Sequence, residues 1–287
     1  MTTLRPQSQA VVTGCDLRVN VLRWGARSRP PLVALHGLRG YAATWELLAR
    51  HLSPTHHVVA PDARGRGDSD WAPDGDYSTG AYLADLEAVV DELRLERFVL
   101  LGHSMGGTTA IAYAARHPGR VSSLIVEDMT PGASAAGPGT DRIRQELAST
   151  PTRFTSRADA FAFWRGRRPG VPDEAIESRL DNTLRPAPDG GLVWKLDAAG
   201  IARARLRTDP GQLLDLWPLV ETLAMPALFI RGDRSDFSTP EVLGEMASRN
   251  RNISWTEIRG AGHYVHDDQP DAFHREVRRF MTTGGGR

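Results

Sequence analysis

The residues with the clearest capacity for chemistry form the sequence Gly102-His103-Ser104-Met105-Gly106, a Gly-x-Ser-x-Gly pattern. The apolar run Phe98–Leu101 precedes the pattern, and a helical pattern begins at Met105. A serine on a sharp turn from strand to helix is exposed in a strained conformation, and small residues two positions before and after it prevent clashes. The helix N-terminus beneath it favours developing negative charge. The pattern therefore predicts that Ser104 is a nucleophile.

A serine nucleophile needs a base, and the segment Gly260-Ala261-Gly262-His263 follows the last apolar strand pattern. Glycines in front of a histidine let a loop carry the imidazole over the edge of a sheet. His266 is the competing histidine, but no glycine pair precedes it. We therefore expect His263 to be the base.

The third member of such a site is a carboxylate that orients the imidazole and stabilises its charged form. In the order nucleophile, acid, histidine, the acid should follow a strand between Ser104 and His263. The strand pattern that ends at Gly232 is followed by Asp233 and Asp236, and another strand pattern ends just before Asp128. We expect Asp236, because it lies far enough into its loop to reach across, with Asp128 as the rival and Asp233 as a third candidate.

An oxyanion formed during acyl transfer needs N–H groups already aimed at it. The residue after the nucleophile, Met105, is expected to supply one N–H. The second is expected from Leu38, in the loop His36–Gly40 that follows an apolar strand pattern. Arg39 in the same loop is interpreted in two ways, as a contact for a substrate carboxylate or as a solvated loop charge.

The elements that must position these residues alternate between strands and helices. Short continuous apolar runs, typical of strands buried on both faces, occur at Leu32–Leu35, His57–Ala60, Phe98–Leu101, Leu124–Val126 and Ala227–Arg231. Helical patterns lie between them at Tyr41–Leu52, Thr79–Leu93 and Met105–His117. This alternation predicts an α/β fold with a mostly parallel, doubly wound sheet.

The alternation stops between residues 130 and 222, where no buried strand is expected. Helical patterns there are Arg142–Leu147, Ala158–Arg165, Asp173–Leu180 and Gly211–Thr222. We therefore expect a core made of residues 1–129 and 223–287, with a helical cap, residues 130–222, inserted into it.

Composition excludes several classes of function. The 287 residues contain 35 Lys and Arg against 35 Asp and Glu, so the chain lacks the positive surplus of nucleic-acid binders and polybasic membrane proteins. The single cysteine, Cys15, forms no intramolecular disulfide. No secretory signal and no apolar run of ~18 residues is present, which predicts a cytoplasmic protein. No spacing of metal ligands is found, and the glycines of Asp62–Asp70 lack the Lys-Ser/Thr of a phosphate-binding loop.

Taken in order, these motifs resemble the α/β-hydrolase superfamily, and specifically its capped small esterases and lactonases. The match runs through His36-Gly37, the turn Asp62–Ser69, Gly102–Gly107, the loop Gly232–Pro240 and Gly262-His263. The resemblance implies an eight-stranded sheet, a helical lid between strands six and seven, a triad of Ser104, His263 and an aspartate, and no cofactor. Members of the family usually carry the acid three residues after the glycine of the strand-seven loop, where this chain has Ser235. The resemblance therefore supports Asp236 with a slip of one residue, while relatives with the acid after strand six keep Asp128 open.

The predicted activity is hydrolysis of a carboxylic ester or lactone of a small apolar-to-aromatic substrate through an acyl-enzyme. Phe161 and Trp164 are three residues apart, so one helical face could place both over an apolar pocket. The alternative is that these aromatic side chains only pack the cap against the core. The same triad would serve a cofactor-free perhydrolase of the haloperoxidase type, a carbon–carbon bond hydrolase or an acyltransferase. A receptor that binds a small molecule with little turnover is the alternative from a different class.

Overall fold

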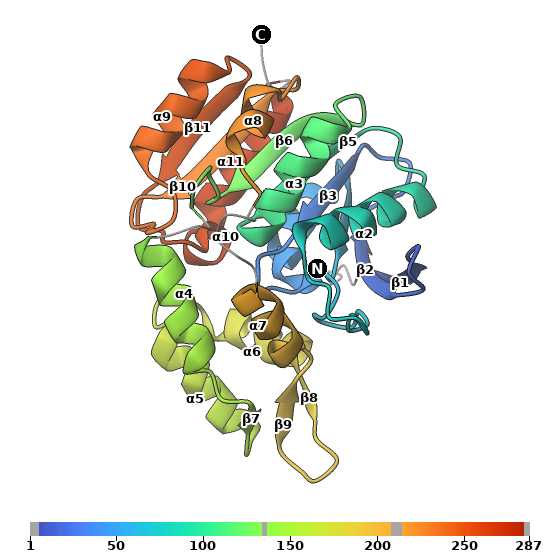
Figure 1. Ribbon diagram of the computed structural model, residues 1–287, viewed down its shortest axis with the longest axis vertical. Coiled ribbons are helices and arrows are strands. Elements are labelled where there is room, and N and C mark those ends of the chain that lie inside the picture. The colour runs from blue at the N-terminus through green and yellow to red at the C-terminus, as the bar shows by residue number, and fades with distance from the viewer. Residues whose placement is uncertain (1–5, 134–136, 208–213, 284–287) are drawn as a thin grey trace.

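The chain is organised around one eight-stranded sheet, as the computed structural model shows for residues 6–133, 137–207 and 214–283. The strand order is β1-β2-β4-β3-β5-β6-β10-β11. Strands β1 and β2 are antiparallel to their neighbours, and all the pairs from β4 to β11 are parallel. The predicted mostly parallel, eight-stranded sheet is therefore confirmed (Figure 1).

The strands of this sheet are β1 (Gln7–Val12), β2 (Arg18–Trp24), β3 (Pro31–Leu35), β4 (His57–Pro61), β5 (Phe98–His103), β6 (Val121–Glu127), β10 (Ala227–Gly232) and β11 (Ile253–Ile258). The helices packed on it are the 3₁₀ helix η1 (Ala42–Trp45), α1 (Glu46–Leu52), α2 (Thr79–Glu92), α3 (Met105–Arg116), α8 (Trp217–Glu221), α9 (Pro240–Arg249), α10 (Val265–Asp268) and α11 (Pro270–Thr282).

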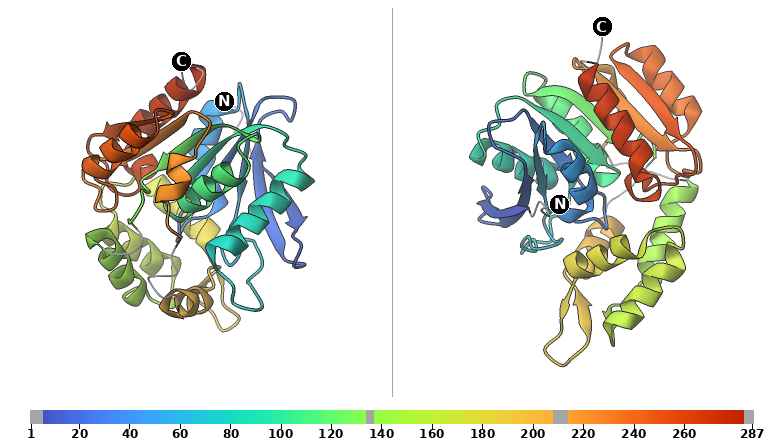
Figure 2. Two further views of the ribbon diagram at one scale, coloured as in Figure 1. Left: turned by 45° about the horizontal axis from the view of Figure 1, so that its top comes forward. Right: turned by 180° about the vertical axis from the view of Figure 1, so that it is seen from behind.

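Both faces of the sheet are buried because its central strands are apolar at most positions on both sides. Along β3, Val33 and Leu35 belong to one hydrophobic cluster, and Leu32 and Ala34 belong to another on the opposite face. The first cluster contains residues of α2, α3, α8 and α9, and the second contains residues of α1 and α11. The two helical layers lie on opposite sides of the sheet in both views of Figure 2. This double burial explains why these strands read as continuous apolar runs.

The segment between β6 and β10 forms a second body at the carboxyl end of the parallel strands (Figure 1). Its elements, apart from α8, are α4 (Pro138–Ala148), β7 (Arg153–Phe154), α5 (Arg157–Arg167), α6 (Asp173–Thr183), β8 (Leu184–Pro186), β9 (Leu192–Trp194) and α7 (Ala198–Arg207). Much of this segment is helical, but it also contains three short strands, most of whose residues are exposed or partly buried. The three short strands form a separate sheet in the order β7-β9-β8.

Sequence patterns also missed β1, α7 and α10. The edge strand β1 is polar and mostly exposed, and α7 was not expected at all. The predicted helix at 211–222 begins outside the described residues, and its described part contains α8. No helix in the described parts of the chain is both long enough and apolar enough to cross a membrane.

Candidate active site

Ser104 occupies the turn between β5 and α3 in a strained backbone conformation. Its φ of 51° and ψ of −116° lie outside the regions that L-residues normally adopt. The turn needs glycine on either side, because a Cβ at Gly102 would overlap the carbonyl oxygen of Gly106, and a Cβ at Gly106 would come within 2.5 Å of the carbonyl oxygen of Leu35. The backbone N–H of Ser104 donates to the carbonyl of Glu127 on the neighbouring strand at 3.0 Å. The serine is therefore fixed in place at the carboxyl edge of the sheet.

His263 lies on the loop after β11 and faces this serine. Its Nε2 is 3.0 Å from the Ser104 Oγ. The ring of Phe237 stacks on the imidazole at 4.1 Å between centroids, and the Nε2 of His103 hydrogen-bonds the backbone carbonyl of His263 at 2.9 Å. Ser104 and His263 are both buried, and these contacts hold the imidazole at hydrogen-bonding distance from the hydroxyl.

The carboxylate that meets His263 belongs to Asp128, directly after β6. Its Oδ2 lies 2.7 Å from the His263 Nδ1, and neither side chain is more than 2% exposed. Asp128 has a φ of 48°, a left-handed conformation that aspartate tolerates better than most residues. With Nδ1–H donating to Asp128, Nε2 of the ring is free to accept the proton of Ser104.

The prediction that Asp236 contacts the histidine is wrong. Both of its carboxylate oxygens accept hydrogen bonds from Arg142 on α4, at 2.7 and 2.8 Å. The Arg142 hydrogen bonds lower the pKa of Asp236 against the opposing effect of its partial burial. Asp233, the third candidate, accepts the backbone N–H of Gly260 at 2.7 Å. Each carboxylate of this loop is thus used by a partner other than the imidazole.

Ser235 is a residue of this site that the sequence interpretation did not assign. Its hydroxyl donates to the Asp128 Oδ2 at 2.6 Å, so the same oxygen also receives the His263 N–H. The Ser235 Oγ in turn accepts the backbone N–H of Phe237 at 3.0 Å. Within the described ranges, the other oxygen of Asp128 has no hydrogen-bond partner. The sequence held one sign of this role: Ser235 lies three residues after Gly232, where the resemblance implies a carboxylate.

His266, the competing base, points away from Ser104 and pairs with Glu127. The His266 Nδ1 lies 2.8 Å from one carboxylate oxygen of Glu127 and 2.9 Å from the other, and the backbone N–H of His266 also donates to Glu127. Its Nε2 lies 3.1 Å from the Thr44 Oγ1. Burial opposes protonation, but the carboxylates of Glu127 and Asp267 outweigh it and raise the pKa of His266. His266 therefore fastens its loop to the end of β6.

The two expected oxyanion donors belong to Leu38, in the loop after β3, and to Met105, the first residue of α3. Among the described residues, no acceptor receives the backbone N–H of Leu38 or of Met105. A Cβ at Gly37 would lie 3.3 Å from the Ser104 Cβ, so the Leu38 loop passes close to the serine. These two N–H groups are consequently available to a substrate carbonyl oxygen.

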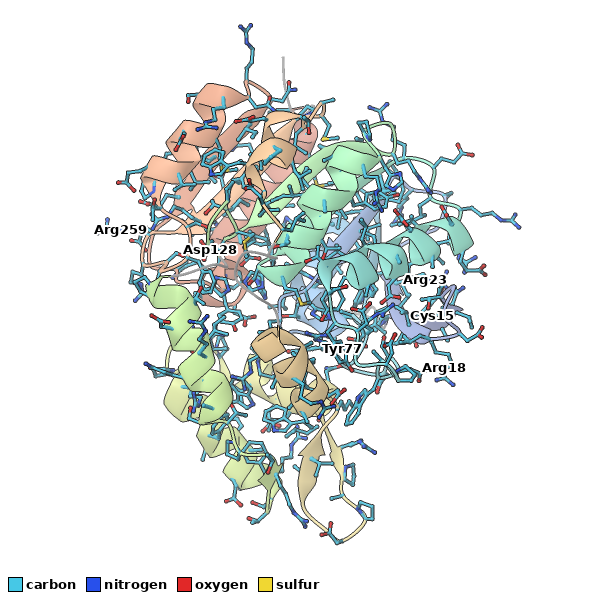
Figure 3. All side chains as sticks on the ribbon, viewed as in Figure 1. Cys15, Arg18, Arg23, Tyr77, Asp128 and Arg259 are labelled. Carbon is cyan, nitrogen blue, oxygen red and sulfur yellow. The ribbon has the colours of Figure 1, made fainter. Side chains whose placement is uncertain are left out.

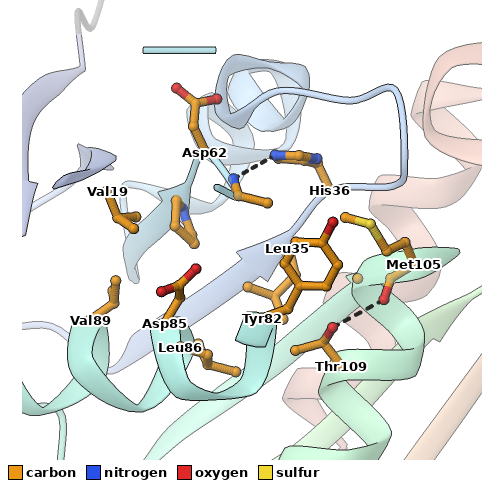
Figure 4. A pocket seen from close by; sticks show the side chains of 13 residues that line it. Val19, Leu35, His36, Asp62, Tyr82, Asp85, Leu86, Val89, Met105 and Thr109 are labelled. Carbon is orange, nitrogen blue, oxygen red and sulfur yellow. Dashed lines mark hydrogen bonds between the residues drawn. The ribbon is translucent and has the colours of Figure 1, made fainter. Parts of the chain in front are cut away.

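His36 fixes the base of this loop. Its Nδ1 donates to the Gly37 carbonyl at 2.7 Å, and its Nε2 accepts the backbone N–H of Ala63 at 3.0 Å (Figure 4). Burial lowers the pKa of His36 to about 3, which keeps the ring neutral and suited to both roles. A cavity of about 40 Å³ behind it, between the sheet and α2, is lined by His36, Met105 and mostly apolar side chains (Figure 4). The cavity reaches the turn around Ser104 only through Met105 and Gly106, and neither Ser104 nor His263 lines it.

The residues predicted to bind substrate have three different environments. Trp164 is buried in the core of the inserted segment, where it meets Trp194 edge to face. Phe161 packs at the margin of that core, under the guanidinium of Arg165. Arg39 is buried, so its interpretation as a solvated charge is wrong. Arg39 and Trp164 line the same small cavity, but Phe161 is not part of its wall.

Ion pairs from Arg142, Arg168 and Arg179 join the inserted segment to the loop after β10 and to α10. Arg142 on α4 pairs with Asp236, and Arg168 at the end of α5 pairs with Asp268 at 2.9 Å. Asp128 lies near the boundary between the sheet with its helices and the inserted segment, as its label in Figure 3 shows. In the described parts of the chain, no group of three or more His, Cys, Asp or Glu side chains is arranged to hold a metal ion.

Comparison with known proteins gives concordant results. Residues 30–270 match the family model of the alpha/beta hydrolase fold. The esterase Rv0045c of Mycobacterium tuberculosis is 30% identical over 282 residues, which cover 97% of this chain and 90% of that protein. The 2-(acetamidomethylene)succinate hydrolase of Mesorhizobium japonicum is 27% identical over 254 residues, covering 88% of each chain. Among solved structures, E-2-(acetamidomethylene)succinate hydrolase superposes with a TM-score of 0.85 at 26% identity, covering 97% of this chain and 100% of that one.

Proposed function

The chain belongs to the α/β-hydrolase family, and from that premise we propose that it is a serine hydrolase that cleaves a carboxylic ester or lactone through an acyl-enzyme. One observation carries the proposal. The Ser104 Oγ, both nitrogens of His263 and the Asp128 carboxylate form a continuous, buried hydrogen-bonded chain with distances of 3.0 and 2.7 Å. The relatives named esterase and hydrolase lend support to hydrolytic chemistry.

In the proposed reaction, the Ser104 Oγ bonds to the acyl carbon while its proton passes to the His263 Nε2. The carbonyl π electrons move onto oxygen, and the N–H groups of Leu38 and Met105 stabilise that oxyanion. When the oxyanion collapses, the bond to the alcohol breaks and the alcohol leaves with the His263 proton. Water then repeats the sequence on the acyl-enzyme and releases the acid. Asp128 holds the ring orientation and stabilises the imidazolium at each step.

The inserted segment is proposed to act as a cap over this site. Its ion pairs to Asp236 and Asp268 attach to loops on either side of His263, and its aromatic core faces the Leu38 loop through Trp164. A cap in that place would exclude water from the acyl-enzyme and select substrates by size. The proposed partner is accordingly a small ester or lactone.

Release of p-nitrophenol from p-nitrophenyl acetate tests the proposal. The expected result is a burst followed by steady turnover proportional to enzyme concentration, which Ser104→Ala reduces by ~10⁴-fold or more. Ser254→Ala, an exposed serine on β11, is the matched control and should retain wild-type turnover. A single slow turnover by the wild-type protein would favour a small-molecule receptor. Turnover by Ser104→Ala within tenfold of wild type would remove Ser104 from the reaction.

A further inference from the structure

Two buried guanidinium groups, those of Arg39 and Arg66, share a cavity beside the proposed oxyanion donors. The cavity measures about 20 Å³ and lies between the loops after β3 and β4 and the inserted segment. Its remaining wall is made of Gly40, Gly67, Trp164, Thr183, Trp194 and Leu196. No aspartate or glutamate lines it. A volume of this size holds one to two water-sized groups, comparable to a carboxylate head.

Arg66 is buried without a carboxylate partner. Its side chain donates to the carbonyls of Leu38 at 3.2 Å and Arg64 at 2.8 Å, and to the Tyr82 hydroxyl at 2.6 Å. It also approaches the Met105 Sδ at 3.5 Å and faces the rings of Tyr77 and Tyr82. Among the residues that the structure describes, no carboxylate forms an ion pair with it. Tyr77, one of the two rings that Arg66 faces, donates its hydroxyl to Asp197.

Arg39 is only partly neutralised. Its Nη1 is 3.7 Å from Glu146, and that carboxylate also accepts a closer ion pair from Arg142 at 2.9 Å. Its Nη2 donates to the Thr150 hydroxyl at 2.9 Å, and its guanidinium lies 5.2 Å from the centre of the Trp164 ring. Arg179 donates to the Arg39 carbonyl at 3.4 Å, and its own charge is paired with Asp267 at 3.3 Å. Positive charge kept out of water in this way favours an incoming anion.

The position of this charge relates it to the reacting group. Arg39 directly follows Leu38, and Arg66 contacts both the Leu38 carbonyl and the Met105 side chain. Neither Leu38 nor Met105 lines the cavity itself, so Arg39 and Arg66 are the residues that connect it to the proposed oxyanion donors. The roof of Trp164 and Trp194 leaves little room for a bulky apolar group there.

We propose that the Arg39–Arg66 cavity binds a free carboxylate on the acyl part of the substrate, so that the preferred substrate is a monoester of a dicarboxylic acid. This inference rests on the proposed ester hydrolysis at Ser104. Arg39 would bind the carboxylate through charge-assisted hydrogen bonds, and the neighbouring Arg66 charge would add attraction without a change in its own bonds.

The test compares mono-p-nitrophenyl esters of succinate, glutarate and adipate with the neutral pentanoate, hexanoate and heptanoate, after the spontaneous rate is subtracted. For at least one chain length, the wild-type kcat/KM should favour the anionic ester by about tenfold or more. Arg39→Gln should lower that anionic-to-neutral ratio to near one, and Arg39→Lys should restore part of it. Arg165→Gln removes an arginine of α5 that does not line the cavity and should leave the ratio unchanged.

Calorimetric titration of the wild-type protein with glutarate keeps the two proposals separate. Binding that is lost in Arg39→Gln supports the cavity, even if no ester is turned over and the proposed function fails. The inference about the cavity is overturned if kcat/KM is equal for anionic and neutral esters at every chain length and glutarate does not bind. Steady turnover of the neutral esters would then still support the proposed hydrolase function.

Discussion

The end of β6 and the loop after β10 both carry acidic side chains next to His263, yet they use them differently. At the end of β6, Glu127 and Asp128 are fully buried, and each holds one histidine of the loop after β11. In the β10 loop, Asp233 is exposed and accepts from the Gly260 N–H, and Asp236 is half-buried and pairs with Arg142. The β10 loop reaches the triad through a hydroxyl, that of Ser235, which donates to Asp128.

This difference shows how conformation outweighs loop length in placing an acid. Asp128 leaves its strand with a φ of 48°, and its carboxylate meets the imidazole one residue beyond the strand. Asp236 has a longer loop, but Arg142 draws its carboxylate toward α4. Position 235, where the resemblance implies an acid, is a serine in this chain. Its hydroxyl donates to Asp128, the aspartate that follows β6. Four substitutions sharpen or break this comparison.

The largest effect is expected from Asp128→Asn. An amide cannot stabilise the imidazolium and favours the wrong tautomer, so kcat should fall by ~10⁴-fold on the proposed ester reaction. Steady-state kinetics with one saturating ester, with the fold checked by circular dichroism, measures it. A loss below tenfold in a folded variant would mean that another carboxylate serves His263.

Glu127→Gln should act on stability. The charged pair with His266 is buried, and its loss should cost about 2 kcal/mol in the free energy of unfolding. Because the folded-state pKa of His266 is raised, the difference between wild type and variant should be full below pH ~6.5 and should shrink as pH rises through that raised value. Urea denaturation from pH 6 to 9 measures it. A difference that grows with pH would contradict a raised pKa of His266 in the folded protein.

Ser235→Ala should have an intermediate effect on activity. It removes one of the two hydrogen bonds to the buried Asp128 carboxylate, and we expect kcat to fall by about tenfold with KM little changed. Ser235→Thr, which keeps a hydroxyl, should recover most of that loss. Equal activity in all three proteins would make the hydroxyl a purely structural group of the β10 loop.

The smallest effect is expected from Asp236→Asn. Turnover should stay within about threefold of wild type, since its ion pair with Arg142 is half-exposed and such pairs contribute ~1 kcal/mol or less. The pKa of Asp236 is lowered in the folded state, so any stability difference should be present above pH ~4 and should disappear as pH falls through the lowered value. Thermal denaturation at pH 7 and pH 3 tests this. A crippled Asp236→Asn enzyme beside an active Asp128→Asn enzyme would reverse the comparison.

The sequence predicted the sheet well because its central strands are buried on both faces and leave continuous apolar runs. The position of Ser104 was readable because its turn requires glycine at 102 and 106, and the position of His263 was readable because the loop before it turns at Gly260, which has a φ of 79°. The strands β7, β8 and β9 were missed because two or three residues give no detectable alternation. The polar edge strand β1 was missed because it contributes little to the core.

The choice of acid failed for a physical reason of another kind. Spacing along the chain shows which carboxylates follow a strand, but the left-handed turn at Asp128 and the partner of Asp236 on α4 are tertiary features. Similarly, nothing in the spacing shows that Arg39 would be buried beneath Trp164. The absence of a carboxylate at position 235 was the one local signal that favoured Asp128.

The most direct test of the account is the proton between His263 and its acid, observed by one-dimensional proton NMR at low temperature. A short hydrogen bond from the His263 Nδ1 to a buried carboxylate should give a resonance far downfield of the amide region. The account predicts that this resonance is present in the wild type and in Asp236→Asn, and that it is absent from Asp128→Asn and from His263→Gln. A downfield resonance that survives in folded Asp128→Asn and disappears in Asp236→Asn would contradict the assignment of Asp128 as the residue that orients the base.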